Sequence, residues 1–199
     1  MSGDVDQTGG SGRLVLVVGP SGAGKDTLIA AARRRHANDA SVVFPRRVVT
    51  RPSSAAEDNI EATPAEFDRE LRFHRFAYTW AAHGHRYGVP ASILDDIAAG
   101  RTVIVNVSRS IVGEARQRHA HVVVVEVTAP IAVLEARVTA RERASDGRPM
   151  DRLTRKIIVE PDHVIVNDGP IEDAVAAFLA VVEPGRTPAR PEDHRRAVG

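Results

Sequence analysis

An apolar, valine-rich run, Leu14–Val18, leads directly into Gly19-Pro20-Ser21-Gly22-Ala23-Gly24-Lys25-Asp26-Thr27, and the apolar residues Leu28–Ala32 follow. The first run predicts a buried strand, and residues 25–36 predict a helix. A glycine-rich turn that ends in lysine, between a strand and a helix, is the pattern of a phosphate-binding P-loop. Its backbone N–H groups point inward at a phosphate, and the helix N-terminus adds partial positive charge. The competing interpretation is a flexible glycine turn with an incidental lysine, which the flanking strand and helix disfavour.

We therefore expect residues 19–27 to bind nucleotide phosphates, with Lys25 reaching the β- and γ-phosphates. The residue after the lysine departs from the usual pattern, because Asp26 stands where serine or threonine commonly holds Mg²⁺. A carboxylate beside a triphosphate is repelled unless a cation lies between them. Asp26 is therefore expected to bind Mg²⁺, directly or through water. The alternative is that Asp26 only complements the positive end of the helix.

Four further β-branched runs alternate with helical segments along the chain. The runs span residues 47–50, 102–107, 121–127 and 163–166. The helical segments span residues 91–99, 109–118, 130–143, 151–159 and 171–182. Repeated strand–helix units build a parallel sheet that helices cover on both faces. The sequence therefore predicts a three-layer α/β fold with five parallel strands in its core.

Length and local composition predict one domain with two tails. The chain has 199 residues, the size of a single domain, and we place the folded part at residues 13–183. Residues 1–12 and 184–199 lack apolar periodicity and are expected to be disordered. Residues 46–90 are polar and rich in turn formers, and so long an excursion usually carries function. We expect this excursion to bind the acceptor substrate.

The charge balance and the residue usage exclude several classes of protein. The chain has 27 Lys and Arg against 26 Asp and Glu, so no strong field favours nucleic acid as a partner. It contains no cysteine, which excludes disulfides, thiolate catalysis and cysteine-ligated metals. No apolar run approaches the roughly 18 residues of a membrane span, and the N-terminus lacks the apolar core of a signal peptide. We expect a cytoplasmic protein without a membrane partner, and its oligomeric state stays open.

An arginine-rich helix end precedes the turn-forming residues 145–149. Guanidinium groups match phosphate oxygens with planar, forked donors, and a flap that carries them can neutralise a phosphoryl group during its transfer. We therefore expect a lid at residues 141–150, with Arg141, Arg143 and Arg152 as catalytic cations. The alternative is a solvated helix end, where the helix dipole favours cations.

Together these motifs resemble a known family. The P-loop, Val49-Thr50-Arg51, Tyr87-Gly88 and the arginine-rich helix end look like the guanylate kinase branch of the nucleoside monophosphate kinases. Several strings are more similar to the ribose 1,5-bisphosphate phosphokinase family: GPSGAGKD at 19–26, RVVTR at 47–51, EDN at 57–59, YTWAAHGHRYGV at 78–89, VNVSR at 105–109 and NDG at 167–169. Guanylate kinases instead have Ser or Thr after the P-loop lysine and an acid where Asn106 stands.

The resemblance implies a nucleoside monophosphate kinase-like fold and a reaction. That reaction is the ATP-dependent, Mg²⁺-dependent phosphorylation of ribose 1,5-bisphosphate to 5-phosphoribosyl 1-diphosphate and ADP. A phosphate acceptor is already ionised at pH 7, so no general base is needed and catalysis reduces to positioning and charge neutralisation. Two alternatives stay open. One is a guanylate or other nucleoside monophosphate kinase, and the other is a catalytically silent guanylate-kinase-like module that binds partner proteins.

The candidate acceptor residues come from the excursion and from the neighbouring strand end. Arg47 and Arg51 are expected to clamp the acceptor phosphate, and Arg109 can reach the same anion. Glu57 can accept hydrogen bonds from ribose hydroxyls, although a solvated loop is an equally simple interpretation. Further acceptor candidates are Trp80, Tyr87 and Asn106. By the resemblance, Asn167 and Asp168 lie beside the adenine, and Asn-Asp-Gly is also an ordinary turn.

Overall fold

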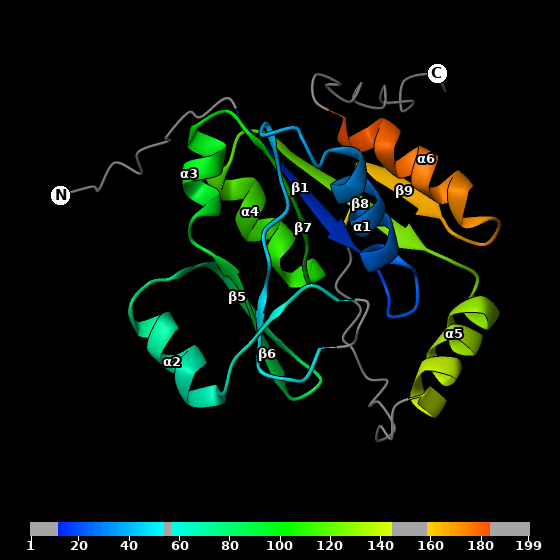
Figure 1. The fold of residues 1–199 in the computed structure, drawn as a ribbon, viewed down its shortest axis with the longest axis horizontal. Helices are drawn as coiled ribbons and strands as arrows, with labels where there is room; N and C mark the ends of the chain where they lie inside the picture. Colours follow the sequence, from blue (N-terminus) through cyan, green and yellow to red (C-terminus); the bar gives the residue numbers. More distant parts are fainter. Residues whose placement is uncertain (1–11, 54–56, 145–158, 184–199) are drawn as a thin grey trace, which may run out of the picture.

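The computed structural model describes residues 12–53, 57–144 and 159–183 of the chain. Its central sheet has five strands, all parallel, in the order β2-β7-β1-β8-β9 (Figure 1). These strands are β2 (Val42–Val43), β7 (Thr102–Asn106), β1 (Arg13–Val18), β8 (Val122–Thr128) and β9 (His163–Val166). The predicted α/β fold with a five-stranded parallel core sheet is therefore confirmed.

One strand of that prediction is wrong. The sequence analysis placed the run at 47–50 in the parallel sheet, but the edge strand beside β7 is the two-residue β2. Strand β3 (Val48–Val49) instead belongs to a second sheet. Pro45 lies between the two strands, and a residue without an N–H group cannot continue a ladder of hydrogen bonds. A strand of two residues also shows no periodicity that the sequence could reveal.

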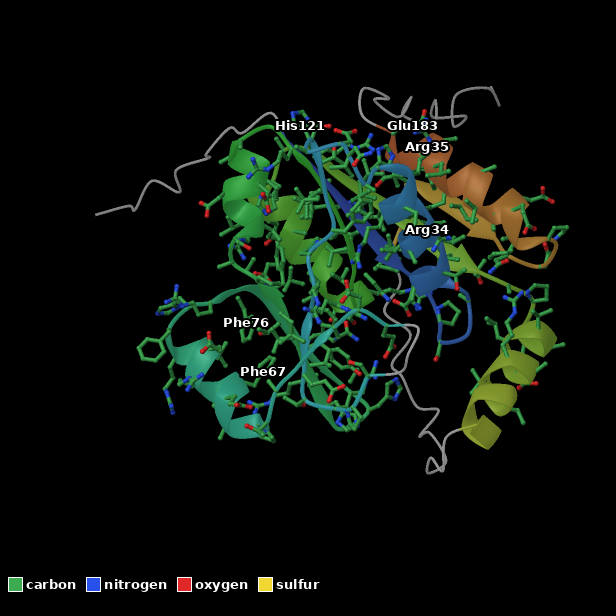
Figure 2. All side chains as sticks on the ribbon, viewed as in Figure 1. Arg34, Arg35, Phe67, Phe76, His121 and Glu183 are labelled. Atoms are coloured by element: carbon green, nitrogen blue, oxygen red, sulfur yellow. The ribbon has the colours of Figure 1, made fainter. Side chains whose placement is uncertain are left out.

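The excursion forms the second sheet, in the order β4-β3-β6-β5. Its remaining strands are β4 (Ile60–Glu61), β5 (Phe76–Ala82) and β6 (His85–Pro90), and α2 (Pro64–Arg72) lies against it. A capping box starts α2, because Thr63 accepts from the Glu66 N–H and the Glu66 carboxylate accepts from the Thr63 N–H. Phe67 of α2 stacks on Phe76 of β5 with ring centroids 4.7 Å apart, which fixes the helix on the sheet (Figure 2).

Helices cover both faces of the central sheet. They are α1 (Lys25–Arg35), α3 (Ile93–Ala98), the 3₁₀ turn η1 (Arg109–Ile111), α4 (Val112–Arg118), α5 (Ile131–Ala144) and α6 (Ile171–Val182). Leu14 and Leu16 of β1 pack with α3 and α4 on one face, whereas Val15 and Val17 pack with α1 and α6 on the other. Side chains alternate along a strand, so this one strand joins both apolar cores. Among the described residues, no helix combines the length and the apolar character that a membrane crossing requires.

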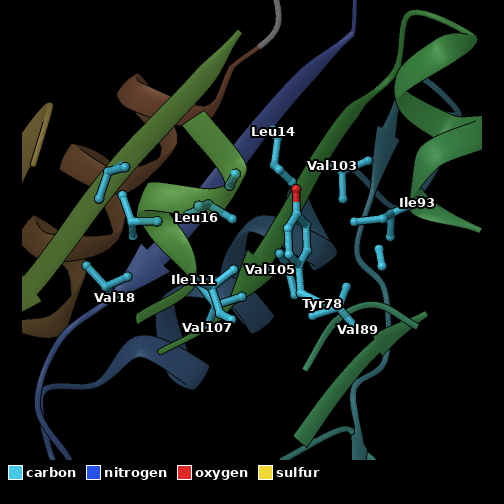
Figure 3. Close-up of a cluster of buried hydrophobic side chains, with 14 of the residues drawn as sticks. Leu14, Leu16, Val18, Tyr78, Val89, Ile93, Val103, Val105, Val107 and Ile111 are labelled. Carbon is cyan, nitrogen blue, oxygen red and sulfur yellow. The ribbon is translucent and has the colours of Figure 1, made fainter. Parts of the chain in front are cut away.

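The second sheet shares the core on the α3/α4 face. Tyr78 of β5 and Val89 of β6 lie in the same buried cluster as Leu14 of β1 and Val105 of β7 (Figure 3). Burial raises the pKa of the Tyr78 phenol to about 12, so the ring stays neutral within that cluster. This shared core sets the excursion against the carboxyl end of the central sheet. The predicted helix at 151–159, most of the lid at 141–150 and nearly all of both tails lie outside the described residues.

The chain leaves β1 at Gly19, which lies against β8. A Cβ atom at Gly19 would come within 2.0 Å of the Val127 carbonyl oxygen, and φ at this residue is +143°. Only glycine allows the first loop residue to lie so close to the neighbouring strand. The path of the loop is therefore set at its first residue.

We predict that Gly19→Ala lowers the free energy of unfolding by about 3 kcal/mol or more, because the new methyl group must push β8 away and φ stays strained. Gly113→Ala is the matched control, since an added Cβ there meets no atom within 4 Å in helix α4. That control is expected to stabilise the protein by about 0.5 kcal/mol, because alanine loses less entropy in a helix. Urea unfolding measures both changes. Equal unfolding midpoints for the two variants would contradict the close packing at Gly19.

Candidate active site

The P-loop connects β1 to α1 at the carboxyl end of the sheet. Gly24 is the N-cap of α1 and has φ 95°, so no side chain of the cap residue occupies the N–H groups of the first helical turn. Those groups are left for an anion. The Nζ atom of Lys25 donates to the carbonyl oxygens of Gly19 (2.9 Å) and Pro20 (2.8 Å). The lysine therefore arches back over the loop, and its predicted contact with the β- and γ-phosphates stays a prediction.

Asp26 meets residues from two other parts of the chain. The Nδ2 atom of Asn106, at the end of β7, donates to Asp26 Oδ1 over 2.9 Å. Arg47 Nη2 lies 3.8 Å from the same oxygen, and Arg47 Nη1 donates to the Asn106 carbonyl oxygen over 3.3 Å. The three side chains line an open pocket with Asp58 and Asn59. The structure thus joins the predicted metal ligand to two predicted acceptor residues.

The Arg47 side chain is 11% exposed and is more enclosed than those of Arg51 and Arg109. Burial lowers its pKa, and the negative charge of Asp26 opposes that effect. Its Nε atom donates to Asn59 Oδ1 over 3.2 Å. Asn59 is itself buried, at 8% exposure, and it was not among the predicted site residues. It holds the Arg47 guanidinium in one orientation, toward the pocket.

Arg51, Glu57, Tyr87 and Trp80 form one contiguous group beside that pocket. Two parallel hydrogen bonds of 2.8 Å join the Arg51 guanidinium to the Glu57 carboxylate, and Arg51 Nε donates to the Tyr87 hydroxyl over 3.2 Å. These bonds, with that to Glu57 foremost, raise the pKa of Arg51. The Trp80 ring stacks on Tyr87 at 5.3 Å with an interplanar angle of 3°. Trp80 and Tyr87 therefore brace the arginine from the second sheet.

Arg109 follows β7 and turns toward β8. Its Nη2 atom donates to Glu126 Oε1 over 2.5 Å. Glu126 pairs in register with Val18, the last residue of β1, so the ion pair crosses the strand that leads into the P-loop. Glu126 was not among the predicted site residues. Its partner lies 17 residues away in the sequence, and no local pattern indicates such a pair.

Asn167 lies beneath the P-loop, whereas Asp168 is exposed. The Asn167 Nδ2 atom donates to the Ala23 carbonyl oxygen over 2.9 Å. Arg137 Nη1, from α5, donates to the Asn167 carbonyl oxygen (3.1 Å) and lies 3.5 Å from that of Gly22. Arg137 was not among the predicted site residues, although it belongs to the same arginine-rich helix. The predicted contact of the Asn167–Asp168 segment with adenine stays a prediction.

The structure brings together two sets of predicted residues. Asp26, directly after the P-loop lysine, contacts Asn106 and Arg47, while Arg51, Glu57, Tyr87 and Trp80 gather beside them. The side chains of Arg141 and Arg143, and all of Arg152, lie outside what the structure describes. Among the described residues, no group of three or more His, Cys, Asp or Glu side chains could hold a metal ion. Mg²⁺ in kinases needs only one or two carboxylates, because water and substrate phosphates complete its shell, and Asp26 at the P-loop fits that role.

Known proteins are similar to this chain in sequence and in fold. The chain is 56% identical over 178 residues to ribose 1,5-bisphosphate phosphokinase PhnN of Rhodopseudomonas palustris, which covers 89% of this chain and 91% of that protein. It is 55% identical over 163 residues to the protein of the same name from Bradyrhizobium diazoefficiens, covering 80% of this chain and 82% of the relative. No protein-family model matches the chain.

A solved structure shows the same fold at lower identity. The guanylate kinase from Anaplasma phagocytophilum superposes with a TM-score of 0.55 and 19% identity, and the match covers 85% of each chain. The P-loop kinase fold is thus shared with a guanylate kinase, whereas the proteins with high sequence identity are ribose 1,5-bisphosphate phosphokinases. On that identity and coverage, the chain belongs to the ribose 1,5-bisphosphate phosphokinase family.

Proposed function

We propose that this chain transfers the γ-phosphoryl group of ATP to the 1-phosphate of ribose 1,5-bisphosphate, giving 5-phosphoribosyl 1-diphosphate and ADP. The observation that carries the proposal is the 56% identity to a phosphokinase of that name over 89% of the chain. The geometry supports it, because Asp26, the residue after the P-loop lysine, and the acceptor candidate Arg47 line one pocket.

The reaction requires that the two substrates be positioned, and it requires no proton transfer by a side chain. An oxygen of the acceptor 1-phosphate forms the new bond to the γ-phosphorus, and the bond from that phosphorus to the β,γ-bridging oxygen breaks. The attacking oxygen is already ionised at pH 7, so no base has to remove a proton. Two anions must be brought into line against their mutual repulsion. Lys25 supplies positive charge in the P-loop, on the donor side, and Arg47 and Arg51 supply it on the acceptor side.

Asp26 is the residue proposed to hold Mg²⁺. Bound there, the ion would neutralise charge on the triphosphate during the transfer. Asn106 donates to one Asp26 oxygen, and this bond fixes the carboxylate while its second oxygen stays available. An amide at position 106 adds no negative charge, so the carboxylate of the pair comes from the P-loop helix. The neighbouring Arg47 keeps this acidic position balanced when no nucleotide is bound.

The first prediction from this proposal concerns the identity of the acceptor substrate. With ATP and Mg²⁺, we expect kcat/KM for ribose 1,5-bisphosphate to exceed that for GMP by about 100-fold or more. Release of ADP measures turnover, and phosphorus NMR identifies a diphosphate at carbon 1 of the product. Fast turnover of GMP with none of the sugar would make the chain a nucleoside monophosphate kinase. Failure to bind ATP at millimolar concentration would support the catalytically silent module.

The second prediction concerns Arg51. Lysine keeps the charge but loses the forked donors, so Arg51→Lys is expected to raise KM for the sugar phosphate about 10- to 100-fold. KM for ATP should stay within about twofold, because Arg51 lies on the acceptor side. Arg34→Ala, an exposed arginine of α1, is the control and should change neither constant. An increase confined to KM for ATP would place Arg51 on the other substrate.

The third prediction concerns Asp26. Asp26→Asn keeps the size of the side chain but removes its charge, so the Mg²⁺ concentration for half-maximal activity should rise about 10-fold or more. Asp173→Asn is the matched control, because Asp173 is also an acid in the first turn of a helix, α6. It reports the helix-dipole effect alone and should leave the Mg²⁺ dependence unchanged. An unchanged Mg²⁺ dependence in Asp26→Asn would remove the metal role.

A further inference from the structure

The P-loop rests on a buried side chain from a distant part of the sequence. Asn167 follows β9, is 3% exposed and donates through Nδ2 to the carbonyl oxygen of Ala23, 144 residues away. Its Oδ1 atom is buried and has no hydrogen-bond partner within the described part of the chain. The carboxamide therefore makes one directed bond, and that bond goes to the backbone of the loop.

The direction of that bond fixes the peptide unit between Ala23 and Gly24. In a trans peptide the C=O and N–H bonds point in opposite directions. Because the Ala23 carbonyl points at Asn167, the N–H of Gly24 points the other way, away from the carboxamide. This N–H belongs to the N-cap of α1, where the helix end favours an anion. The Asn167 carboxamide thus orients a hydrogen-bond donor of the backbone, the Gly24 N–H.

Steric fit restricts the same peptide. A Cβ atom at Gly24 would come within 2.4 Å of Asn167 Nδ2, so the carboxamide fills the space that any larger residue would need. Gly24 also has φ +95°, a conformation that other residues rarely adopt. Loop and carboxamide are therefore in direct contact, and the bond to Ala23 has no room to be replaced by water.

Asn167 is itself held at both of its backbone polar atoms. Its N–H donates to the Thr128 carbonyl oxygen over 2.7 Å, and its carbonyl oxygen accepts from Arg137 over 3.1 Å. The first bond joins it to β8 and the second to α5. A side chain anchored in this way is a rigid support for the loop.

We propose that Asn167 is a positioning residue of the donor site: its carboxamide holds the Ala23–Gly24 peptide so that the Gly24 N–H faces the phosphates of the nucleotide. This role rests on the donor half of the proposed function, in which the P-loop binds ATP. It differs from a contact with adenine, because the amide group reaches the loop backbone. It also explains why a buried position carries an amide donor rather than an apolar side chain.

The test uses ADP binding, which does not depend on the acceptor. Asn167→Ala and Asn167→Asp are expected to weaken ADP binding about 10-fold or more, since a hydrogen bond to a charged group loses its alignment. Asp should have the larger effect, because its carboxylate cannot donate to the Ala23 carbonyl and also sets a negative charge against that oxygen. Isothermal titration with ADP and Mg²⁺ gives Kd. In turnover, KM for ATP should rise while KM for the sugar phosphate stays within about twofold.

Two control variants separate positioning from stability. Phe178→Leu removes core volume in α6, in the buried cluster that also holds Ala23, but it removes no hydrogen bond to the P-loop backbone, so it should lower the unfolding midpoint with ADP affinity unchanged. Asn59→Ala removes the other buried asparagine of the site, which holds Arg47. It should raise KM for the sugar phosphate and leave ADP binding unchanged, the opposite pattern to Asn167→Ala.

Each result decides the proposal. Weak ADP binding by a folded Asn167 variant, with Phe178→Leu binding normally, supports it. Normal ADP binding by Asn167→Ala overturns it, as does an equal loss of affinity in Phe178→Leu at a matched unfolding midpoint. If Asn167→Ala does not fold, Asn167→Ser provides the same readout with a smaller change in burial. If the unsubstituted protein binds ADP but does not phosphorylate ribose 1,5-bisphosphate, the result counts against the proposed acceptor. ADP binding by the Asn167 variants then still tests the role of Asn167.

Discussion

Close contact between the P-loop backbone and three neighbouring elements is the constraint on which the rest of the site depends. Gly19 lies against the Val127 carbonyl of β8, Gly22 lies against α5, and Gly24 lies against Asn167. A loop enclosed on three sides cannot adjust its peptides to an arriving phosphate. Its N–H groups must already point in the binding direction, which is how a site stabilises charge without reorganising during the reaction. The central sheet is the frame for this loop, because its carboxyl ends bring the surrounding residues together.

The acceptor side follows a different principle. Several of its cations are held by carboxylates of the protein: Arg51 by Glu57, Arg109 by Glu126, and Arg33 and Arg46 by Asp58. These partners orient the guanidinium groups and balance their charge when no anion is bound. An incoming phosphate must compete with them or share their donors. A site of this kind discriminates by geometry, since a weakly placed anion does not displace a bidentate carboxylate.

The sequence predicted the parts of this protein that local patterns encode. Valine-rich runs identified β1, β7, β8 and β9, and the glycine-rich turn with Lys25 identified the loop between β1 and α1. The run at 47–50 was assigned to the wrong sheet, because Pro45 and the two-residue β2 leave no periodicity to read. The P-loop pattern pointed to Asp26, and the excursion and strand ends, together with the family resemblance, pointed to Arg47 and Asn106; the structure places both of these residues in contact with Asp26.

The supporting residues of the site were not predictable in the same way. Asn59, Glu126, Arg137 and the side chain of Asn167 act on partners that are distant in sequence, such as Arg47, Arg109 and Ala23. Such contacts depend on how the two sheets and α5 pack, and a single asparagine or glutamate gives no local signal of its partner. The residues proposed to touch substrate follow motifs, whereas the residues that hold them in place follow from tertiary structure.

A crystal structure with a non-hydrolysable ATP analogue, Mg²⁺ and ribose 1,5-bisphosphate tests the central claim most directly. The account predicts that residues 19–25 enclose the β- and γ-phosphates, and that the acceptor 1-phosphate lies between the γ-phosphate and Arg47. Nucleotide density away from the loop, or a sugar phosphate bound out of line with the γ-phosphate, would contradict it.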